Sequence, residues 1–235
     1  MDLYESLSSV AVHDGAFISL IGGGGKTTLM IEWASWLRSR GYRVLMTTTT
    51  KIMSPSLMDC KADYVFSSDE VHTFCPQGPC SVLYALGDSS TNKWTSPPVE
   101  QFDILRTRYD VIINEADGSK RLPVKVHTQR DPVVPGLTTY TVSILGLWAI
   151  GKRTSEVAFG ESRDLIVDSS YIRWLLDDPE GLLKGSIPGR RAIVLNGAEC
   201  IGQDVCESLK SLLFPSDAFV CTASEREGVI YERIQ

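Results

Sequence analysis

Four consecutive glycines followed by a lysine and two threonines form the stretch of this sequence best suited to chemistry. An apolar run, Phe17–Ile21, precedes the glycines, and a helical pattern follows them. A strand, a glycine-rich turn and a helix start, in this order, are typical of a phosphate-binding loop. Glycine backbones can turn several N–H groups onto one anion, and the helix adds its positive N-terminal end. We therefore expect the binding residues to be Gly22, Gly23, Gly24, Gly25, Lys26, Thr27 and Thr28.

Within this loop the spacing predicts separate roles. Lys26 is expected to reach the terminal phosphates, and the Thr27 hydroxyl to contact a phosphate-bound Mg²⁺. The long form of the motif has glycine where this chain has Leu20, so the short form Gly22-x-x-Gly25-Lys26-Thr27 remains, as in Mur-type ligases. ParA-like ATPases carry an additional lysine where Ile21 stands. The alternative, a glycine-rich turn without function, fits this order of residues less well.

A second stretch, Tyr109–Gly118, is an apolar strand that ends in acids. Glu115 and Asp117 are two residues apart, so in an extended chain they share one face. One acid is expected to hold Mg²⁺ and the other to orient a water or a substrate hydroxyl, as on the Mg²⁺-side strand of phosphate-loop NTPases. A solvated strand end is the alternative.

Basic and hydroxyl side chains follow two of the predicted strands. Lys120 is expected to neutralise phosphate charge, and Arg121 and Lys125 either to join it on a γ-phosphate or an anionic second substrate or to serve solubility. The run Thr47–Lys51 ends another strand, and we predict Thr49 as a further metal ligand, against the alternative that threonine favours strands. His127 is expected to be structural.

The last two predicted strands end where GTPases place their base-contacting residues. Asn196 matches the first residue of the pattern Asn-Lys-x-Asp, whereas Gly197 replaces the lysine and Glu199 the aspartate. A carboxylate can accept hydrogen bonds from guanine, so Glu199 can substitute. We predict a nucleotide base near Asn196 and leave ATP and GTP as alternatives.

Composition restricts the class of protein. The chain has 235 residues, a net charge of −6 and 43% hydrophobic residues, and its pI is about 5.1. This balance argues against a broad nucleic-acid or membrane surface. The sequence has neither an apolar run of the ~20 residues that span a bilayer nor a signal peptide, so a cytoplasmic location is expected. The six cysteines lack zinc spacings and are expected to be free thiols.

Apolar strands alternate with helical segments along the chain, which predicts an α/β fold: a three-layer αβα sandwich with a mostly parallel, P-loop NTPase-like sheet. We expect one domain over residues 1–235, with a loop-rich insertion at about 54–100 and mobility near 87–98. The glycine loop, Thr47–Lys51, Glu115–Asp117 and Asn196 all follow strands, so they should converge on one edge of the sheet.

Taken together, these motifs resemble one family. Four stretches of the chain are similar, in order and spacing, to the YqeC family. They are Gly-Gly-Gly-Gly-Lys-Thr-Thr, Thr-Thr-Thr-Thr-Lys-Ile, Asn-Glu-Ala-Asp-Gly-Ser-Lys-Arg-Leu-Pro-Val-Lys and Arg-Asp-Pro-Val-Val-Pro. Asp131 stands where that family tends to have glutamate. The resemblance implies an accessory role for selenium-dependent molybdenum hydroxylases, with such an enzyme or its maturation factors as partners.

The expected function is Mg²⁺-dependent binding and hydrolysis of ATP or GTP in support of cofactor maturation. Lys26, Glu115, Asp117 and Lys120 are the expected catalytic residues, and Thr27, Thr49, Glu115 and Asp117 the expected metal ligands. Two alternatives remain. One is an ATP-dependent small-molecule kinase or Mur-like ligase, and the other is a nucleotide-gated binding module or chaperone with little turnover.

Overall fold

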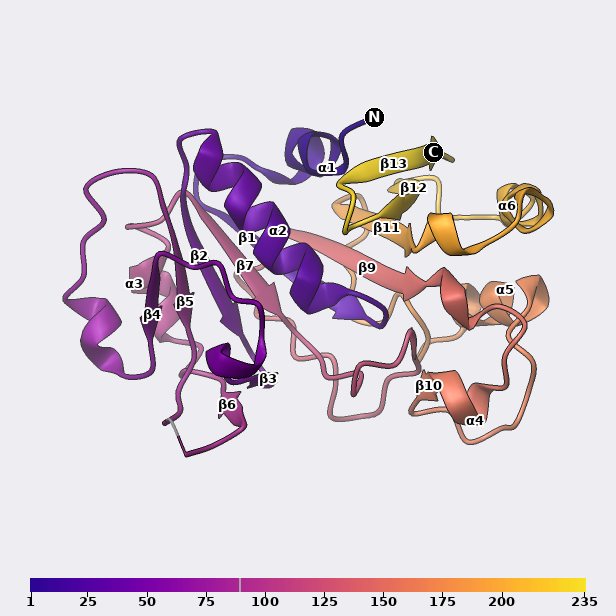
Figure 1. Ribbon diagram of the computed structural model, residues 1–235, viewed down its shortest axis with the longest axis horizontal. Coiled ribbons are helices and arrows are strands. Elements are labelled where there is room, and N and C mark those ends of the chain that lie inside the picture. Colours follow the sequence, from indigo (N-terminus) through magenta and orange to yellow (C-terminus); the bar gives the residue numbers. More distant parts are fainter. Residues whose placement is uncertain (89) are drawn as a thin grey trace.

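Nine apolar strands pair into one central sheet, in a computed structural model that describes residues 1–88 and 90–235. The strand order is β13-β12-β11-β9-β1-β7-β2-β5-β4 (Figure 1). Every pairing in this sheet is parallel except that of β12 with β13. The strands are β1 (Ala16–Gly22), β2 (Arg43–Thr48), β4 (Tyr64–Phe66), β5 (Cys80–Tyr84), β7 (Val111–Glu115), β9 (Tyr140–Gly146), β11 (Arg191–Asn196), β12 (Ala218–Ser224) and β13 (Val229–Arg233).

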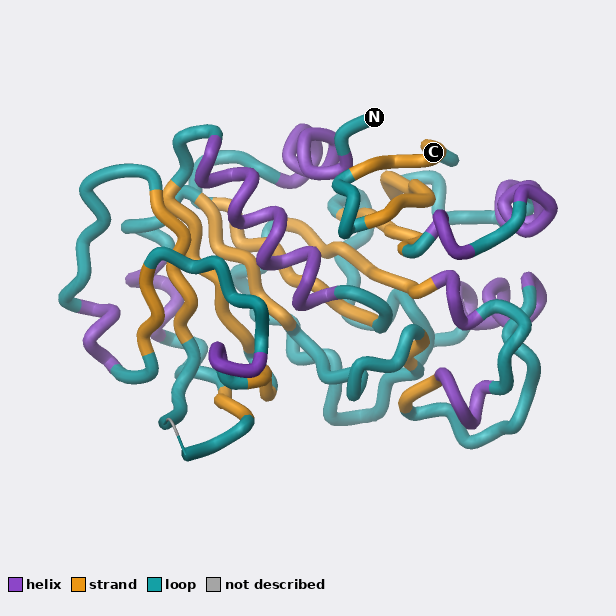
Figure 2. Tube along the Cα trace, viewed as in Figure 1, coloured by secondary structure: helices purple, strands orange, loops and turns teal. Residues whose placement is uncertain are grey.

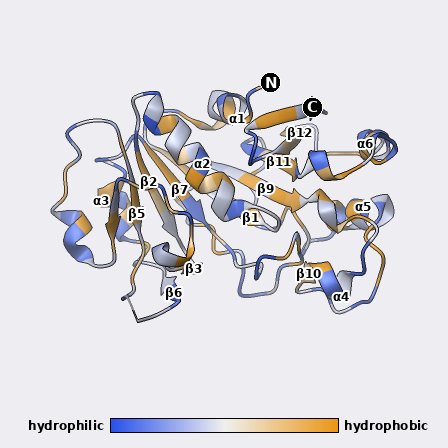
Figure 3. Cartoon of the chain, in the orientation of Figure 1, coloured by the Kyte–Doolittle hydropathy of each residue, from blue (hydrophilic) through white to orange (hydrophobic). Residues whose placement is uncertain are grey.

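Helices cover both faces of the sheet, which confirms the predicted α/β sandwich of three layers. One face packs against α1 (Leu3–Ala11) and α2 (Lys26–Ser39). The other face packs against α3 (Gln101–Leu105) at one end, and against α5 (Ser169–Asp177) and α6 (Gln203–Lys210) at the other. Figure 3 shows hydrophobic colour concentrated on the strands between these layers.

Alternation along β1 explains why two apolar layers form. Ile18 and Leu20 face α1 and α2, whereas Phe17 points to the opposite face and packs on Phe102 of α3. Successive side chains of a strand point to opposite faces, so a strand buried on both sides is expected to be mostly apolar. All of β1 is buried, and its one polar side chain, Ser19, has a hydrogen-bond partner in Thr138 at 3.0 Å.

Two small strand pairs flank the carboxyl edge of the main sheet. One joins β3 (Lys51–Met53) to β6 (Lys93–Thr95), and the other joins β8 (Val124–Lys125) to β10 (Ala158–Phe159), which follows α4 (Thr154–Val157). Short 3₁₀ turns complete the fold at Pro55–Leu57, Asp69–His72, Leu147–Ala149 and Ala198–Cys200. Figure 2 shows the loops that border this edge below the central strands.

The stretch 54–100, expected as a loop-rich insertion, contributes β4 and β5 to the main sheet. All five residues of β5 are buried, so this part of the chain belongs to the core. Within the segment 87–98, for which we expected mobility, residue 89 lies outside the described residues. Trp94 of the same segment is 8% exposed and packs in the core.

The two ends of the chain meet beside β13 (Figure 1). Asp2 forms a bridge with Val229, and the Leu3 N–H donates to the Gly228 carbonyl at 2.9 Å. The six cysteines are free, as the sequence predicted. In the part of the chain that the structure describes, none of the helices is long and apolar enough to cross a bilayer.

Candidate functional site

The glycine loop joins the carboxyl end of β1 to the first turn of α2. Gly22, Gly24 and Gly25 have φ values of 99°, 79° and 121°, which favour glycine. The protein itself also packs closely against the loop. A Cβ on Gly22 would lie 2.3 Å from the Ile144 carbonyl oxygen, and one on Gly24 would lie 2.4 Å from the Gly146 nitrogen. The glycines are therefore required by both conformation and close backbone packing.

The backbone N–H groups of the loop divide into two sets. Those of Gly22, Gly23 and Gly24 donate to Asp117 Oδ2 (2.7 Å), the Ile144 carbonyl (2.9 Å) and the Leu122 carbonyl (3.2 Å). For the N–H groups of residues 25–28, no acceptor lies within hydrogen-bond distance among residues 1–88 and 90–235. These four groups open a helix and border a cavity. Of the seven predicted binding residues, Gly22, Gly23 and Gly24 thus use their N–H groups to attach the loop to the protein, and those of residues 25–28 face the cavity.

Lys26 is folded back onto its own loop. Its Nζ lies 2.9 Å from Asp117 Oδ1 and donates to the Gly22 carbonyl at 2.5 Å. The Ser119 hydroxyl lies 3.4 Å away. The side chain is 2% exposed, yet the residue borders the cavity. The ammonium group is therefore held at the site by protein acceptors, in the place from which it can contact a bound phosphate.

Asp117 serves the loop rather than a metal. Its Oδ1 pairs with Lys26, and its Oδ2 accepts from Gly22 and from His127 Nε2 at 2.6 Å. Burial opposes ionisation, but the Lys26 ammonium and the hydrogen bonds from His127 and Gly22 outweigh it and lower the pKa of Asp117 to about 2. Asp117 is fully buried and does not border the cavity. Both carboxylate oxygens of Asp117 face protein groups, so its position does not support the predicted metal and water roles.

His127 completes this buried network, and no local pattern indicates its partners beyond a single histidine after the basic stretch. Its Nδ1 lies 2.7 Å from the Gly181 carbonyl oxygen, and its Nε2 faces Asp117. The ring is held between these two oxygen atoms and positions Asp117, which is the structural role expected for it.

Glu115 and Thr27 form the part of the site that suits a metal. The Thr27 hydroxyl donates to Glu115 Oε2 at 2.7 Å, and both residues border the cavity. Burial raises the pKa of Glu115, and Lys26 and Thr27 oppose that shift. The described residues contain no group of three or more acidic, histidine or cysteine side chains arranged around one metal position. A hydroxyl and one carboxylate nevertheless fit Mg²⁺, which usually takes one or two carboxylates and completes its shell with phosphates and water.

Thr49, which we predicted as a metal ligand, does not lie at the cavity. Thr49 donates to the Val133 carbonyl at 2.6 Å and accepts from Asn114 at 3.2 Å, and it does not border the cavity. The Thr49 hydroxyl therefore has protein partners, and its neighbours Thr50 and Lys51 border the cavity instead. The prediction of Thr49 as a metal ligand is therefore not supported by its position.

Asn196 braces the glycine loop. Its Nδ2 donates to the Gly24 carbonyl at 2.8 Å, and its Oδ1 accepts from the Glu225 N–H at 3.0 Å. With 1% exposure, its amide lies beneath the loop and does not border either cavity. Asn196 is therefore not positioned to contact a bound base, whereas Glu199, which follows it by three residues, borders a cavity.

Two cavities meet at the loop. The larger, of about 1050 Å³, extends from residues 24–28 towards β3 and β6 and includes Lys120. The smaller, of about 250 Å³, is bordered by Trp148, Glu199, Cys200, Glu225 and Arg226. The two share Trp148, Glu225 and Arg226, so they are contiguous. Trp148 was not among the predicted site residues. The two glycines near it, Gly146 and Gly197, could have indicated it, because they leave room for its ring: a Cβ on either would lie within 3 Å of the ring.

Removing the carboxylate of Asp117 tests the buried network. Asp117→Asn leaves the buried Lys26 ammonium without its counter-charge, so we expect the free energy of unfolding in urea to fall by about 3 kcal/mol. Its exposed counterpart, Asp164→Asn, breaks a surface pair with Arg153 and should lower the free energy of unfolding far less. Because the pKa of Asp117 is lowered, its contribution is present above about pH 4 and is lost as the pH falls towards 2. Equal losses in the two variants would contradict the network.

Comparisons with known proteins show that the chain is similar to one family. The family model described as "YqeC: YqeC protein" matches residues 18–160, a range that contains the glycine loop, Glu115 and Lys120. A relative from Escherichia coli (strain K12), described as an uncharacterized protein YqeC, is 29% identical over 192 residues. That match covers 75% of this chain and 73% of the relative. The chain belongs to the YqeC family.

Proposed function

We propose that the protein binds a nucleoside triphosphate with Mg²⁺ and hydrolyses it. One observation carries the proposal. Residues 25–28, whose N–H groups have no hydrogen-bond partner within residues 1–88 and 90–235, border the same cavity as Lys26 and the Thr27–Glu115 pair. Helix N-termini with free N–H groups favour phosphate, and an adjacent hydroxyl and carboxylate suit its magnesium ion.

The positions of the two cavities support one direction for the nucleotide. The phosphate tail lies on residues 25–28. Lys26 keeps its ion pair with Asp117 and exchanges its 3.4 Å contact with the Ser119 hydroxyl for the terminal phosphates. Thr27 and Glu115 would hold Mg²⁺, which supplies neutralising charge during phosphoryl transfer. The base enters the smaller cavity, where the Trp148 ring offers a stacking surface and Glu199 and Arg226 offer polar contacts. Both purine triphosphates remain candidates.

The biological setting follows the resemblance of the motifs. We place the nucleotide turnover in the maturation of a selenium-dependent molybdenum hydroxylase or its cofactor. The kinase or ligase alternative gains support from the extent of the larger cavity, which reaches beyond the loop to β3 and β6. The third candidate, a nucleotide-gated module, would use the same binding site and would differ from a hydrolase only in its slower nucleotide turnover.

The Thr27–Glu115 pair can be tested through its metal dependence. Glu115→Gln keeps an acceptor for Thr27 but removes the charge, so Mg²⁺ should no longer tighten nucleotide binding, and turnover should fall by about 100-fold. Calorimetry with a non-hydrolysable ATP analogue, with and without Mg²⁺, measures the first effect. Glu207→Gln, on the exposed surface of α6, serves as the matched control. Unchanged metal dependence in Glu115→Gln would exclude this metal site.

Because the proposed base site lies on Trp148, changing this residue should weaken the binding of a nucleotide but not the binding of a phosphate chain alone. Trp148→Ala removes the stacking surface and should weaken ATP or GTP binding about tenfold. Inorganic tripolyphosphate contacts only the loop, so its affinity should stay unchanged and report that the loop is intact. Equal weakening of nucleotide and tripolyphosphate would show that Trp148 supports the fold of the loop instead of the base.

A further inference from the structure

Seven cations and five acids border the larger cavity, the acids being Glu32, Asp59, Glu115, Asp131 and Glu225. Two of these acids, Glu32 and Asp131, pair with lysines that do not border the cavity, so its cations are in excess. Besides Lys26, it is bordered by six cations: Lys51, Lys93, Lys120, Arg121, Arg130 and Arg226. No salt bridge to an acidic side chain is found for any of these six within residues 1–88 and 90–235. In a chain with a net charge of −6, free cations gathered at one cavity point to an anionic ligand.

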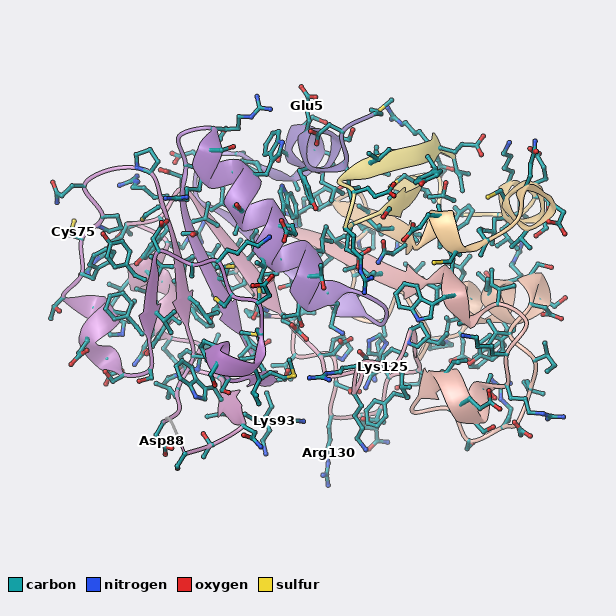
Figure 4. The ribbon with its side chains drawn as sticks, in the orientation of Figure 1. Glu5, Cys75, Asp88, Lys93, Lys125 and Arg130 are labelled. Carbon is teal, nitrogen blue, oxygen red and sulfur yellow. The ribbon has the colours of Figure 1, made fainter. Side chains whose placement is uncertain are left out.

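Five of these cations come from segments that do not border the smaller cavity. We call this set the basic wall: Lys51 and Lys93 on the β3–β6 pair, Lys120 and Arg121 in the turn before β8, and Arg130 in the loop after it. Figure 4 shows Lys93 and Arg130 along the same lower margin of the molecule. The basic wall and the smaller cavity are therefore built by different segments of the chain.

The turn that carries Lys120 and Arg121 is held in an unusual conformation. Both residues have positive φ, 51° and 65°, although neither is glycine. Such backbone conformations cost energy and persist where surrounding contacts fix them, often at ligand sites. Here the Lys120 ammonium lies 4.7 Å from the centre of the Phe159 ring, and Arg121 Nη2 lies 2.7 Å from Met53 Sδ. These contacts fix both cations at the cavity.

Apolar groups lie beside the basic wall. Ile52, Met53, Leu57 and Met58 border the same cavity, and Leu57 is 51% exposed. A volume of about 1050 Å³ is at the upper end of the ~300–1,000 Å³ typical of small-molecule sites, while the base has a cavity of its own. Space for a second molecule therefore remains beyond the phosphate tail.

We propose that this part of the cavity binds a second substrate, a small molecule that combines an apolar or aromatic body with phosphate or carboxylate groups. The anionic groups contact the basic wall, and the body lies on Met53 and its apolar neighbours. The inference rests on the proposed function for its order of sites, with the base, the phosphate tail and the second substrate in sequence. It assigns Arg121 and Arg130 to substrate specificity and not to nucleotide binding.

Pyridoxal 5′-phosphate, an aromatic aldehyde with one phosphate, is a suitable probe. Its aldehyde condenses with a lysine amine with loss of water, and borohydride reduces the imine to a stable amine that peptide mass spectrometry locates. With saturating Mg²⁺ and a non-hydrolysable ATP analogue, we expect labelling of Lys51, Lys93 and Lys120 well above that of Lys152, an exposed lysine without an ion pair outside the cavity.

Two variants separate the second site from the nucleotide site. Arg121→Gln and Arg130→Gln should each reduce labelling of the three lysines about fivefold and leave the affinity for the ATP analogue unchanged. Arg190→Gln, an exposed position outside the cavity, should change neither. Labelling no greater than at Lys152, or labelling abolished by the analogue, would overturn the second site and leave the proposed function standing. Selective labelling in a protein that fails to bind the analogue would overturn the proposed function and leave the second site standing.

Discussion

The buried ion pair between Lys26 and Asp117 joins the glycine loop of β1 to the segment that follows β7, and the rest of the site depends on it. The two groups are 2.9 Å apart, and their side chains are 2% and 0% exposed. Desolvation makes a buried pair a weak source of net stability, whereas losing one partner leaves an uncompensated charge. The pair therefore acts mainly by fixing geometry, with His127 holding Asp117 from the other side.

This geometry explains why the loop has open N–H groups at all. Asp117, Ile144 and Leu122 accept from the first three glycines, which turns the chain so that residues 25–28 enter α2 at the cavity. Asn196 and Glu225 close the loop from beneath, since a Cβ on Gly25 would lie 2.6 Å from the Asn196 amide. Parallel strands bring all these segments to the same edge of the sheet, so distant parts of the chain can build one site.

Much of this arrangement could be predicted from the sequence. Apolar runs and glycine signals gave most strands and helices of the sandwich, and the rule that parallel strands end at one edge brought Glu115 and Asp117 to the loop. The hydrophobic pattern could not predict the direction of side chains that follow the end of a strand. β7 ends at Glu115, so the extended geometry that would have put Asp117 on the same face no longer applies. Thr49 and Asn196 likewise lie at the expected edge but point to protein partners.

Other features depend on long-range contacts that no local pattern contains. β13 pairs with β12 and with Asp2 at the other end of the chain, and short β4 and β5 become sheet members only through β2. His127 and Trp148 gain their roles from Asp117 and from the glycines around the indole. Some of these partners are far apart in sequence, as Asp2 is from Val229 and Trp148 from Gly197. Others are closer, as His127 is to Asp117 and β13 to β12, but they meet only because the chain between them folds back.

The central claim is that the open N–H groups of residues 25–28 bind the phosphate tail, and amide NMR tests it most directly. A ¹⁵N–¹H spectrum of the whole chain, titrated with Mg²⁺ and a non-hydrolysable ATP analogue, follows each backbone amide separately. The account predicts large shifts for Gly25, Lys26, Thr27 and Thr28, and small shifts for Gly22 and Gly23, whose N–H groups already have protein acceptors. Amides of residues 25–28 that stay in place at saturating nucleotide would contradict it.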